Sequence, residues 1–272
     1  MAKVDIMLPF WGDVNLLKKA VLSVTGQTEQ DWRLVILDDC YPSEEPLKFI
    51  NSLGDTRIEY IRHKNNIGVT KNFNECIKLA KSEYCILIGC DDMLLPHYLS
   101  TALDAIGDAD MYQPSVGVIN KDGVSYLPLV DRVKRILRPK KSGIYQGEKL
   151  ATSLSRGNWL YFPSIMWRTA SLQRYRFNPN FKITQDILLE LQLIIDNGVL
   201  YLDNNHKTFL YRRFSESLSS KEKKNGGVRF DEETAAYNHL ASLFESRGWP
   251  KAKKAAQQQL ISKIHRKISS FK

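Results

Sequence analysis

The sequence predicts an α/β fold in which helices cover the faces of one sheet. Strand and helix patterns alternate through the first hundred residues, as they do in layered α/β domains. The predicted strands are largely apolar, which is expected of strands buried on both faces. The composition is globular, since 43% of the 272 residues are hydrophobic and 25% are charged. It excludes disordered, collagen-like and disulfide-rich chains.

Four strands and three helices are predicted in the first hundred residues. The strands lie at 3–8, 32–37, 57–62 and 85–88, and the helices at 15–25, 47–53 and 68–80. Pro9 is expected to end the first strand. Ligands of open α/β sheets bind beyond the carboxyl ends of strands, so the residues that follow three of these strands are candidate site residues. They are Pro9-Phe10-Trp11, Asp38-Asp39 and Asp91-Asp92.

The second half of the chain is less regular. Strands are predicted at 111–119, 124–128, 199–202 and 207–212, and helices at 147–154 and 186–197. We expect a basic loop at 132–141 and a mobile loop in the polar stretch 215–227. From Phe230 onward the pattern is helical, with a break at Gly248-Trp249-Pro250.

Charge is distributed unevenly along the chain. The formal net charge is +9, yet residues 132–141 carry six Lys or Arg, residues 247–272 carry eight, and neither segment has an acid. The rest of the chain is mildly acidic, with a charge of about −5. Basic patches on such a body bind nucleic acid, anionic lipid or phosphorylated substrates.

The N-terminal segment and the cysteines favour a cytoplasmic protein. Asp5 and Pro9 interrupt the first apolar stretch, so we expect a strand there and not a signal peptide. No apolar run approaches the roughly 18–20 residues that a membrane-spanning helix needs. The four cysteines show neither CxxC pairs nor zinc-finger spacing, which predicts free thiols in a reducing compartment.

Adjacent carboxylates at the end of a strand have few structural uses. Like charges side by side repel, so Asp91-Asp92 require a cation. Mg²⁺ and Mn²⁺ commonly bridge one or two carboxylates to substrate phosphates, and a nucleoside diphosphate would complete that coordination. Asp38-Asp39 could accept hydrogen bonds from a base or a ribose. One such pair is weak evidence, whereas two pairs at two strand ends favour a metal site.

Five blocks of the sequence occur in the order and at the intervals of a known family. They are VDIMLPFWG, SVTGQT, VILDDCYPSEE, RIEYIRHKNNIG and KNFNECIKLAKSEYCILIGCDDMLLP. The chain thereby resembles a family-2 glycosyltransferase with the GT-A fold over residues 3–215. The resemblance implies a Rossmann-like mixed sheet flanked by helices. The GT-A domain would span 1–215, with a nucleotide-sugar-binding half at 1–115 and an acceptor half at 116–215, followed by a basic helical region at 216–272.

The resemblance also implies the reaction and the base-binding residues. A metal-dependent, inverting transfer would move a sugar from a nucleotide-diphosphate sugar, preferably a UDP-sugar, to a saccharide acceptor in bacterial surface polysaccharide assembly (O-antigen, capsule or lipooligosaccharide). Pro9, Phe10 and Trp11 would line the nucleobase pocket, with Trp11 stacking on uracil. Asp39 would accept a hydrogen bond from the base, and Asp38 would support it.

The same resemblance implies a set of residues around the diphosphate. Asp92 would be the main ligand of Mn²⁺ or Mg²⁺, and Asp91 would contact ribose or metal. Lys71 would reach the nucleotide. The family's D-x-D-D run is here Gly89-Cys90-Asp91-Asp92, so its first carboxylate is missing.

A downstream carboxylate would be the catalytic base. The family's Glu-Asp pair at the start of a helix corresponds to Gln185-Asp186, which leaves Asp186 as the base that takes the proton of the acceptor hydroxyl. Glu190, one helical turn on, would share the face of Asp186 and be its partner or an acceptor contact, the alternative being a carboxylate with no catalytic role. The alternative is that Asp186 only serves the dipole of its helix.

The remaining implied residues lie around the acceptor and the diphosphate. Arg212 or Arg213 would clamp a phosphate, because they fall in the segment that resembles the family's closing loop. Trp159 and Tyr161 belong to an aromatic cluster in which at least one ring would contact the acceptor. The alternative for such a cluster is packing in the core.

The basic C-terminal segment leaves two interpretations open. Its apolar residues fall on one helical face, namely Leu260, Ile261, Ile264, Ile268 and Phe271. The helix would either anchor the enzyme peripherally on the anionic inner face of the plasma membrane, near an acceptor linked to a lipid diphosphate, or pack on the domain.

Two other functions compete with sugar transfer. Nucleic-acid binding is disfavoured, because the carboxylates at the strand ends would repel a phosphate backbone. A catalytically impaired relative that only binds nucleotide sugars is the other alternative, suggested by Gly89 and Gln185.

Overall fold

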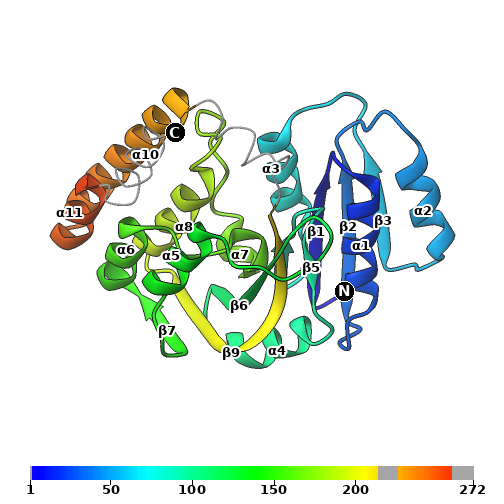
Figure 1. The fold of residues 1–272 in the computed structure, drawn as a ribbon, viewed down its shortest axis with the longest axis horizontal. Helices are drawn as coiled ribbons and strands as arrows, with labels where there is room; N and C mark the ends of the chain where they lie inside the picture. The colour runs from blue at the N-terminus through cyan, green and yellow to red at the C-terminus, as the bar shows by residue number, and fades with distance from the viewer. Residues whose placement is uncertain (1, 214–225, 259–272) are drawn as a thin grey trace.

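The computed structural model describes residues 2–213 and 226–258. Its strands form one nine-stranded sheet, and helices cover both faces of that sheet (Figure 1). The strand order is β3-β2-β1-β4-β8-β6-β9-β5, and β7 pairs with β9. The strands are β1 (Val4–Phe10), β2 (Trp32–Asp38), β3 (Ile58–Arg62), β4 (Tyr84–Leu87), β5 (Met93–Leu94), β6 (Met111–Ile119), β7 (Gly143–Gln146), β8 (Met166–Arg168) and β9 (Val199–Arg212). The helices are α1 (Val14–Thr25), α2 (Glu45–Leu53), α3 (Val69–Leu79), α4 (Tyr98–Ile106), α5 (Leu129–Leu137), α6 (Gly147–Arg156), α7 (Thr169–Leu172), α8 (Gln185–Ile195), α10 (Gly226–Ser246) and α11 (Pro250–Gln258).

The first four strands form the parallel part of the sheet. β1 pairs with β2 on one side and with β4 on the other, and β3 extends the sheet beyond β2. Side chains along β1 alternate between two cores: Ile6 and Leu8 belong to the core of α1 and α4, and Met7 to the core of α3, α6 and α8. These elements confirm the sequence prediction except at Pro9. The ladder continues past the proline, because the Asp39 N–H donates to the Phe10 carbonyl at 2.9 Å.

The second part of the sheet is mixed. β8 is antiparallel to β4 and β6, β6 is parallel to β9, and β5 and β7 are antiparallel to β9. The strands predicted at 199–202 and 207–212 are one strand, because β9 continues through a register shift against β6. The strand predicted at 124–128 is wrong, since a single bridge from Ile119 to Ser125 lies there. β5, β7 and β8 went unpredicted because two to four residues are too short to show a period.

Residues 132–141 form mostly a helix and not the predicted loop. α5 ends at Leu137, and its inward face carries Asp131, which is completely buried, and Lys134. Leu129 and Ile136 lie on the outward face, where they are 64% and 74% exposed. Leu129, Val133 and Ile136 recur at helical spacing, but the six Lys and Arg from residue 132 to residue 141 made the segment resemble a basic loop in the sequence.

The C-terminal helices pack against helices from the second half of the chain. α10 lies against α8, and α11 lies against α6 and α10 (Figure 1). The predicted break is confirmed, since α10 ends at Ser246 and α11 begins at Pro250. Most of the loop predicted at 215–227, and all of the amphipathic segment from Leu260 to Phe271, lie outside the described residues. Across the described ranges, no helix is long and apolar enough to cross a membrane.

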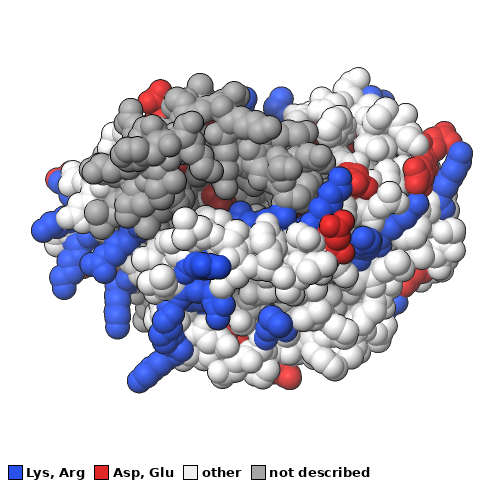
Figure 2. Space-filling model, in the orientation of Figure 1, with Lys and Arg blue, Asp and Glu red and all other residues white. Residues whose placement is uncertain are grey.

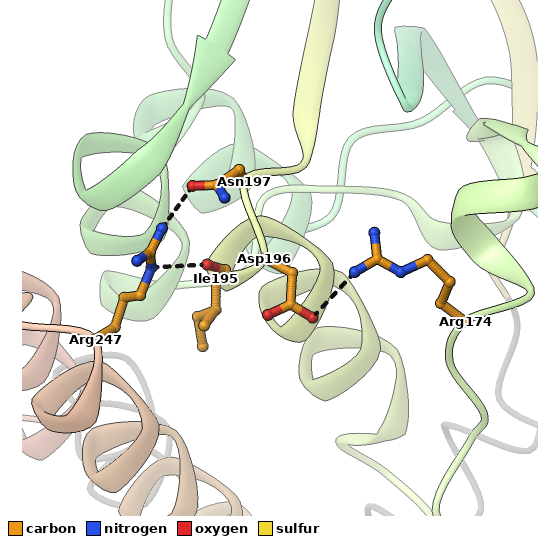
Figure 3. Close-up of a pocket in the computed structure, with 5 residues that line it drawn as sticks. All are labelled: Arg174, Ile195, Asp196, Asn197 and Arg247. Atoms are coloured by element: carbon orange, nitrogen blue, oxygen red, sulfur yellow. Dashed lines mark hydrogen bonds and ion pairs between the residues drawn. The ribbon is translucent and has the colours of Figure 1, made fainter.

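An open cavity of about 360 Å³ lies where α10 meets the end of α8 (Figure 3). On one side, Arg247 donates to the Ile195 carbonyl at 3.0 Å and to Asn197 Oδ1 at 2.6 Å. On the other side, Arg174 forms an ion pair with Asp196 at 3.8 Å. Both arginines are engaged by the chain itself, so this cavity is a joint between elements and not a candidate site.

Candidate active site

The carboxyl ends of β1, β2 and β4 meet at one edge of the sheet, because the three strands are parallel neighbours. A cavity of about 770 Å³ opens at this edge. The predicted residues that line it are Pro9, Phe10, Trp11, Asp39, Asp91, Asp92 and Arg212. Other lining residues were not singled out in the sequence, among them Asn66, Asn72, Lys121 and Tyr211. The three strand ends thus form one continuous cavity.

The aromatic residues at the end of β1 have different environments. Trp11 lines the cavity and is 58% exposed. Phe10 is completely buried and packs against Tyr41, with ring centroids 5.1 Å apart. An exposed indole beside a cavity offers a flat surface on which a planar ring can stack.

The two aspartates at the end of β2 also differ. Asp39 lines the cavity and accepts the backbone N–H groups of Ile67 and Gly68, at 2.6 and 2.9 Å. Asp38 is completely buried and accepts a hydrogen bond from the Tyr60 hydroxyl at 2.6 Å. Asp39 therefore holds the loop that leads into α3 and stays accessible from the cavity, whereas Asp38 joins β2 to β3.

Asp91 and Asp92 converge on the backbone of Gly89. A Cβ at position 89 would lie 2.9 Å from Asp91 Oδ1 and 2.8 Å from Asp92 Oδ2, closer than stable contacts allow. Burial raises the pKa of both carboxyls, and the charge of Asp91 raises that of Asp92 further. The glycine that replaces the first acid of the D-x-D-D run thus makes room for the other two.

This pair fits a divalent cation whose coordination is completed by a substrate. Within the described residues, no group of three or more His, Cys, Asp or Glu side chains is placed to hold a metal alone. Mg²⁺ and Mn²⁺ nevertheless bind commonly through one or two carboxylates and substrate phosphates. Asp92 Oδ1 accepts the Arg212 N–H at 2.8 Å, which leaves Oδ2 beside Asp91 Oδ1 above Gly89. One oxygen of each aspartate therefore faces the same point.

The structure assigns both arginines of the predicted phosphate clamp to protein partners. The Arg212 guanidinium donates to the carbonyl oxygens of Asp91 and Asn120, both at 2.8 Å. Arg213 forms a two-point ion pair with the buried Asp131, with N–O distances of 2.6 and 3.0 Å. Arg212 lines the cavity but its guanidinium is engaged by these carbonyls, and Arg213 is not among the lining residues, so neither arginine is free to clamp a phosphate in this arrangement. Arg212 instead orders the loop that carries Asp91, and Arg213 holds α5.

The predicted lysine is not at the cavity. Lys71 lies on α3, where it is exposed, and it is not among the lining residues. Lys121, just after β6, does line the cavity. Sequence reasoning missed Lys121 because the loop after β6 returns to the cavity only through the pairing of β6 with β9.

Asp186 lies in the first turn of α8, as predicted, and is half-buried. Its Oδ1 accepts the Ile187 N–H at 2.8 Å. Burial raises the pKa of the Asp186 carboxyl, although the Ile187 N–H and the Lys134 ammonium oppose the rise. Gln185 accepts a hydrogen bond from the Thr70 hydroxyl at 3.1 Å, so the residue that replaces the family's Glu ties α8 to α3.

A residue of α10 caps the start of α8. Glu232 Oε1 accepts the backbone N–H groups of Ile183 and Thr184, at 2.6 and 3.0 Å, and the Thr184 hydroxyl at 3.2 Å. Thr184 makes no capping hydrogen bond with its own side chain. The turn that carries Asp186 is therefore fixed from the C-terminal region, which the sequence did not indicate.

Charged groups are buried one helical turn beyond Asp186. Glu190 is completely buried; its Oε2 accepts a hydrogen bond from Asn158 Nδ2 at 3.0 Å, and its Oε1 has no partner in the described part of the chain. Burial raises the pKa of Glu190 well above its ordinary value, and the charge of Asp186 adds to the rise. Burial also lowers the pKa of Lys134 to about 8. Sequence reasoning missed Lys134 because α5 was expected to be a loop.

Tyr211 lies near the end of β9. It lines the cavity, and its ring centroid is 5.3 Å from that of Tyr161. Burial raises the pKa of the Tyr211 hydroxyl, and the charges of Asp92, Asp91 and Asp186 raise it further. All three carboxylates therefore lie within electrostatic reach of one side chain.

The aromatic cluster is part of the core. Trp159 is completely buried, and Tyr161 is 6% exposed and donates to Asp131 Oδ1 at 2.8 Å. Phe162 and Trp167 pack in the same core as Trp159. Their burial does not support stacking of an acceptor sugar on these rings, and core packing accounts for them.

The sequence model of glycosyl transferase family 2 matches residues 5–169. The chain therefore belongs to glycosyl transferase family 2. This match confirms the family that the five sequence blocks indicate.

Two characterised or named relatives illustrate the family. WcaA of Escherichia coli (strain K12), named provisionally as a colanic acid biosynthesis glycosyl transferase, is 37% identical over 101 residues, which are 37% of this chain and 36% of that protein. The GalNAc(5)-diNAcBac-PP-undecaprenol beta-1,3-glucosyltransferase of Campylobacter jejuni is 27% identical over 126 residues, which are 45% of this chain and 40% of that protein. This chain therefore matches well under half of the length of each relative.

Solved structures match almost the whole chain. TarS of Staphylococcus aureus (residues 1–349), in complex with UDP-GlcNAc, has a TM-score of 0.69 at 15% identity, over 98% of this chain and 73% of that one. The mannosyltransferase PcManGT of Pyrobaculum calidifontis, in complex with GDP-Man and Mn²⁺, has a TM-score of 0.62 at 10% identity, over 99% of this chain and 75% of that one. These similarities confirm the predicted GT-A fold.

Proposed function

We propose that this chain is a metal-dependent, inverting glycosyltransferase that moves a sugar from a UDP-sugar to a saccharide acceptor. The observation that carries the proposal is the cavity at the strand ends, which Trp11, Asp39, Asp91 and Asp92 line together. Sugar transfer needs a cation for the leaving diphosphate and a base for the acceptor hydroxyl. The paired aspartates supply the place for the first, and Asp186 supplies the second.

The donor nucleoside would occupy the cavity at the ends of β1 and β2. A volume of about 770 Å³ lies within the range of small-molecule sites. The exposed indole of Trp11 would stack on the base. Asp39 would accept the ring N–H of the base, because each of its oxygens has a second lone pair beside the backbone N–H that it already accepts.

Asp91 and Asp92 would hold Mn²⁺ or Mg²⁺ against the diphosphate. When bound, the cation neutralises charge on the departing phosphates. Arg212 would act indirectly, because its backbone N–H fixes Asp92 and its guanidinium fixes the Asp91 carbonyl. The only other cation that we assign to the diphosphate is Lys121, which lines the cavity.

Asp186 would remove the proton from the acceptor hydroxyl as its oxygen attacks the anomeric carbon. The new C–O bond forms on the face opposite the diphosphate, and the electron pair of the broken C–O bond leaves with the diphosphate, so the configuration inverts. Burial strengthens Asp186 as a base, because a raised pKa means that the ionised carboxylate binds a proton more tightly.

The names of the relatives support a setting in surface polysaccharide assembly. One relative is named for colanic acid biosynthesis, and the name of another contains a glycan on a diphosphate-linked undecaprenol. We therefore include an acceptor linked to a lipid diphosphate, at the cytoplasmic face of the plasma membrane, in the proposal. Nucleic acid is not part of it.

Two aspartate variants test the proposal. Asp186→Asn should lower turnover of a UDP-sugar by about 100- to 10,000-fold, because the base is lost. It should leave the Mn²⁺-dependent thermal shift with UDP unchanged, whereas Asp92→Asn should abolish that shift. Asp104→Asn, exposed on α4, is the matched control.

Two outcomes would oppose the proposal. Folded Asp186→Asn and Asp92→Asn proteins that turn over every donor as fast as the parent would remove the assigned roles. A parent that binds UDP-sugars but turns over none, with any acceptor supplied, would identify a binding relative without activity.

A further inference from the structure

The outward surface of α5 and the adjoining strand β7 is both apolar and basic. Leu129 and Ile136 of α5 are 64% and 74% exposed, and Ile144 of β7 is 56% exposed. Arg132 and Arg135 are exposed on α5. We call this surface, with the exposed Lys140 and Lys141 between the two elements, the α5–β7 face.

The two most exposed apolar side chains of α5 lie on its outward side, although Leu137 of the same helix packs against the core. The side that faces the protein carries Asp131, in its ion pair with Arg213, and Lys134. The side that faces outward carries leucine and isoleucine at positions 129 and 136, two helical turns apart. A surface helix normally buries its apolar stripe, so an outward apolar stripe indicates a second apolar phase outside the molecule.

The charge around this stripe has one sign. Six Lys or Arg occur from residue 132 to residue 141, and no Asp or Glu occurs from residue 132 to residue 147. Lys and Arg gather on the side of the molecule that carries α5, β7, α6 and α11 (Figure 2). A partner of this face must therefore be anionic where it meets the cations and apolar where it meets Leu129, Ile136 and Ile144.

We propose that the α5–β7 face docks on a membrane of anionic phospholipids. The aliphatic side chains would enter the boundary of the acyl chains, and the surrounding Arg and Lys would contact the phosphate groups of the lipids. Nucleic acid also carries phosphates, but leucine and isoleucine offer no ring on which a base can stack. The combination of aliphatic and basic side chains therefore favours lipid.

Membrane binding at the α5–β7 face would bring the membrane close to the candidate catalytic base. The inward side of the same helix carries Lys134, which lies near Asp186 and Glu190. A membrane on the outward side would lie one helix away from the candidate base. Lipid binding by this face is independent of the proposed function, whereas its use for presenting a lipid-linked acceptor rests on that function.

Co-sedimentation of the full chain with vesicles tests the proposal. The vesicles are phosphatidylcholine with or without phosphatidylglycerol. Neutralising three cations in Arg135→Gln/Lys140→Gln/Lys141→Gln should lower partitioning onto the anionic vesicles by about 100-fold. Ile136→Ser/Ile144→Ser should lower it by about tenfold, because the aliphatic insertion is lost.

Matched controls carry equivalent changes on other surfaces. Leu22→Ser removes an aliphatic side chain that is 51% exposed on α1. Lys48→Gln/Lys78→Gln/Lys81→Gln removes three exposed charges from other parts of the surface. Both controls should bind vesicles as the parent does, and all variants should keep the parent's melting temperature and its thermal shift with UDP.

Three results would overturn the proposal. The first is a parent that does not sediment with anionic vesicles. The second is a set of α5–β7 face variants that sediment as well as the parent, which would place the contact elsewhere. Binding of a short RNA that depends on the same cations, without vesicle binding, would assign the face to nucleic acid. If the parent protein binds anionic vesicles but transfers no sugar to a water-soluble acceptor, the result counts against the proposed function and not against lipid binding.

Discussion

Lys134 is the residue through which α5 acts on the candidate base. Its ammonium opposes the rise in the pKa of Asp186, so removing the charge should raise that pKa further. In Lys134→Met, the acid limb of the pH profile of kcat/KM should therefore move to higher pH, because a general base must be ionised. Steady-state kinetics across the pH range measure this shift. Lys140→Met, on the exposed end of the same segment, should leave the limb in place, and a uniform loss of rate in Lys134→Met without a shift would contradict the electrostatic role.

Glu190 should make stability depend on pH. Its pKa is raised in the folded protein, so the proton is held more tightly there than in the unfolded chain, and stability falls as the pH rises through the folded value. Glu190→Gln cannot ionise and can still accept the Asn158 hydrogen bond. Its melting temperature relative to the parent should increase from pH about 5 to pH about 9. Glu44→Gln, at an exposed carboxylate, should show no such trend, and an equal offset at both pH values would count against a buried, raised carboxyl.

The sequence predicted the site residues that follow strand ends. It did not predict the roles of residues whose interaction partners lie far away in the chain. Trp11 and Asp39 directly follow strands and Asp92 lies five residues after β4, so their place at the edge of the sheet follows from the strand pattern. Arg213 resembles a phosphate-binding residue in sequence, but its partner Asp131 lies 82 residues earlier in the chain. A local pattern cannot show such a pairing, because it depends on how β9 and α5 meet.

The loop from β4 to β5 depends on a residue without a side chain. Gly89→Ala would place a methyl group 2.8 Å from Asp92 Oδ2 and 2.9 Å from Asp91 Oδ1, so the two carboxylates must separate. We expect the affinity for Mn²⁺, measured by thermal shift in the presence of UDP, to fall by about tenfold or more, since ligand geometry sets metal affinity. Gly12→Ala is the control, because its Cβ would meet Cys90 Sγ at an ordinary 3.5 Å. Equal Mn²⁺ affinity in Gly89→Ala and the parent would show that the pair does not hold the metal.

Helices and strands were predicted correctly where the residues that the structure buries recur with the period of a helix or form an apolar strand. β1, β2 and β4 are largely apolar and buried, and α1 shows an apolar stripe that the structure buries. Prediction failed for α5, whose inward face is held by an ion pair and by the contact of Lys134 with the Leu160 carbonyl. A charged residue that is buried because it pairs with another protein group cannot be distinguished in a sequence from a charged residue exposed to solvent.

The C-terminal region acts on the catalytic side of the whole molecule. Glu232 of α10 caps the turn that carries Asp186, so Glu232→Ala should misplace the base without touching the donor cavity. We expect kcat to fall by about tenfold while KM for the donor stays unchanged, because small displacements of catalytic groups are costly. Glu232→Gln should restore most of kcat, since its amide oxygen can accept the same N–H groups. Glu245→Ala, 65% exposed on α10, is the control, and an increase in donor KM in Glu232→Ala would indicate a general structural defect instead.

The family resemblance implies a division into a domain at 1–215 and a separate region at 216–272. The contacts of α10 with α8, and of α11 with α6, favour treating both helices as part of the acceptor half. Composition could not reveal this, because the helices meet the rest of the chain through a few specific groups such as Glu232 and Arg247.

β9 limits how this chain can be recombined with its relatives. The strand pairs with β5, β6 and β7, and its end binds Asp92 through the Arg212 N–H. The next residue, Arg213, binds Asp131 of α5. A chimera that takes its donor half from one protein and its acceptor half from another would divide these contacts between two sequences that did not evolve together. Specificity in this protein is therefore better exchanged through single loops than through half-molecules.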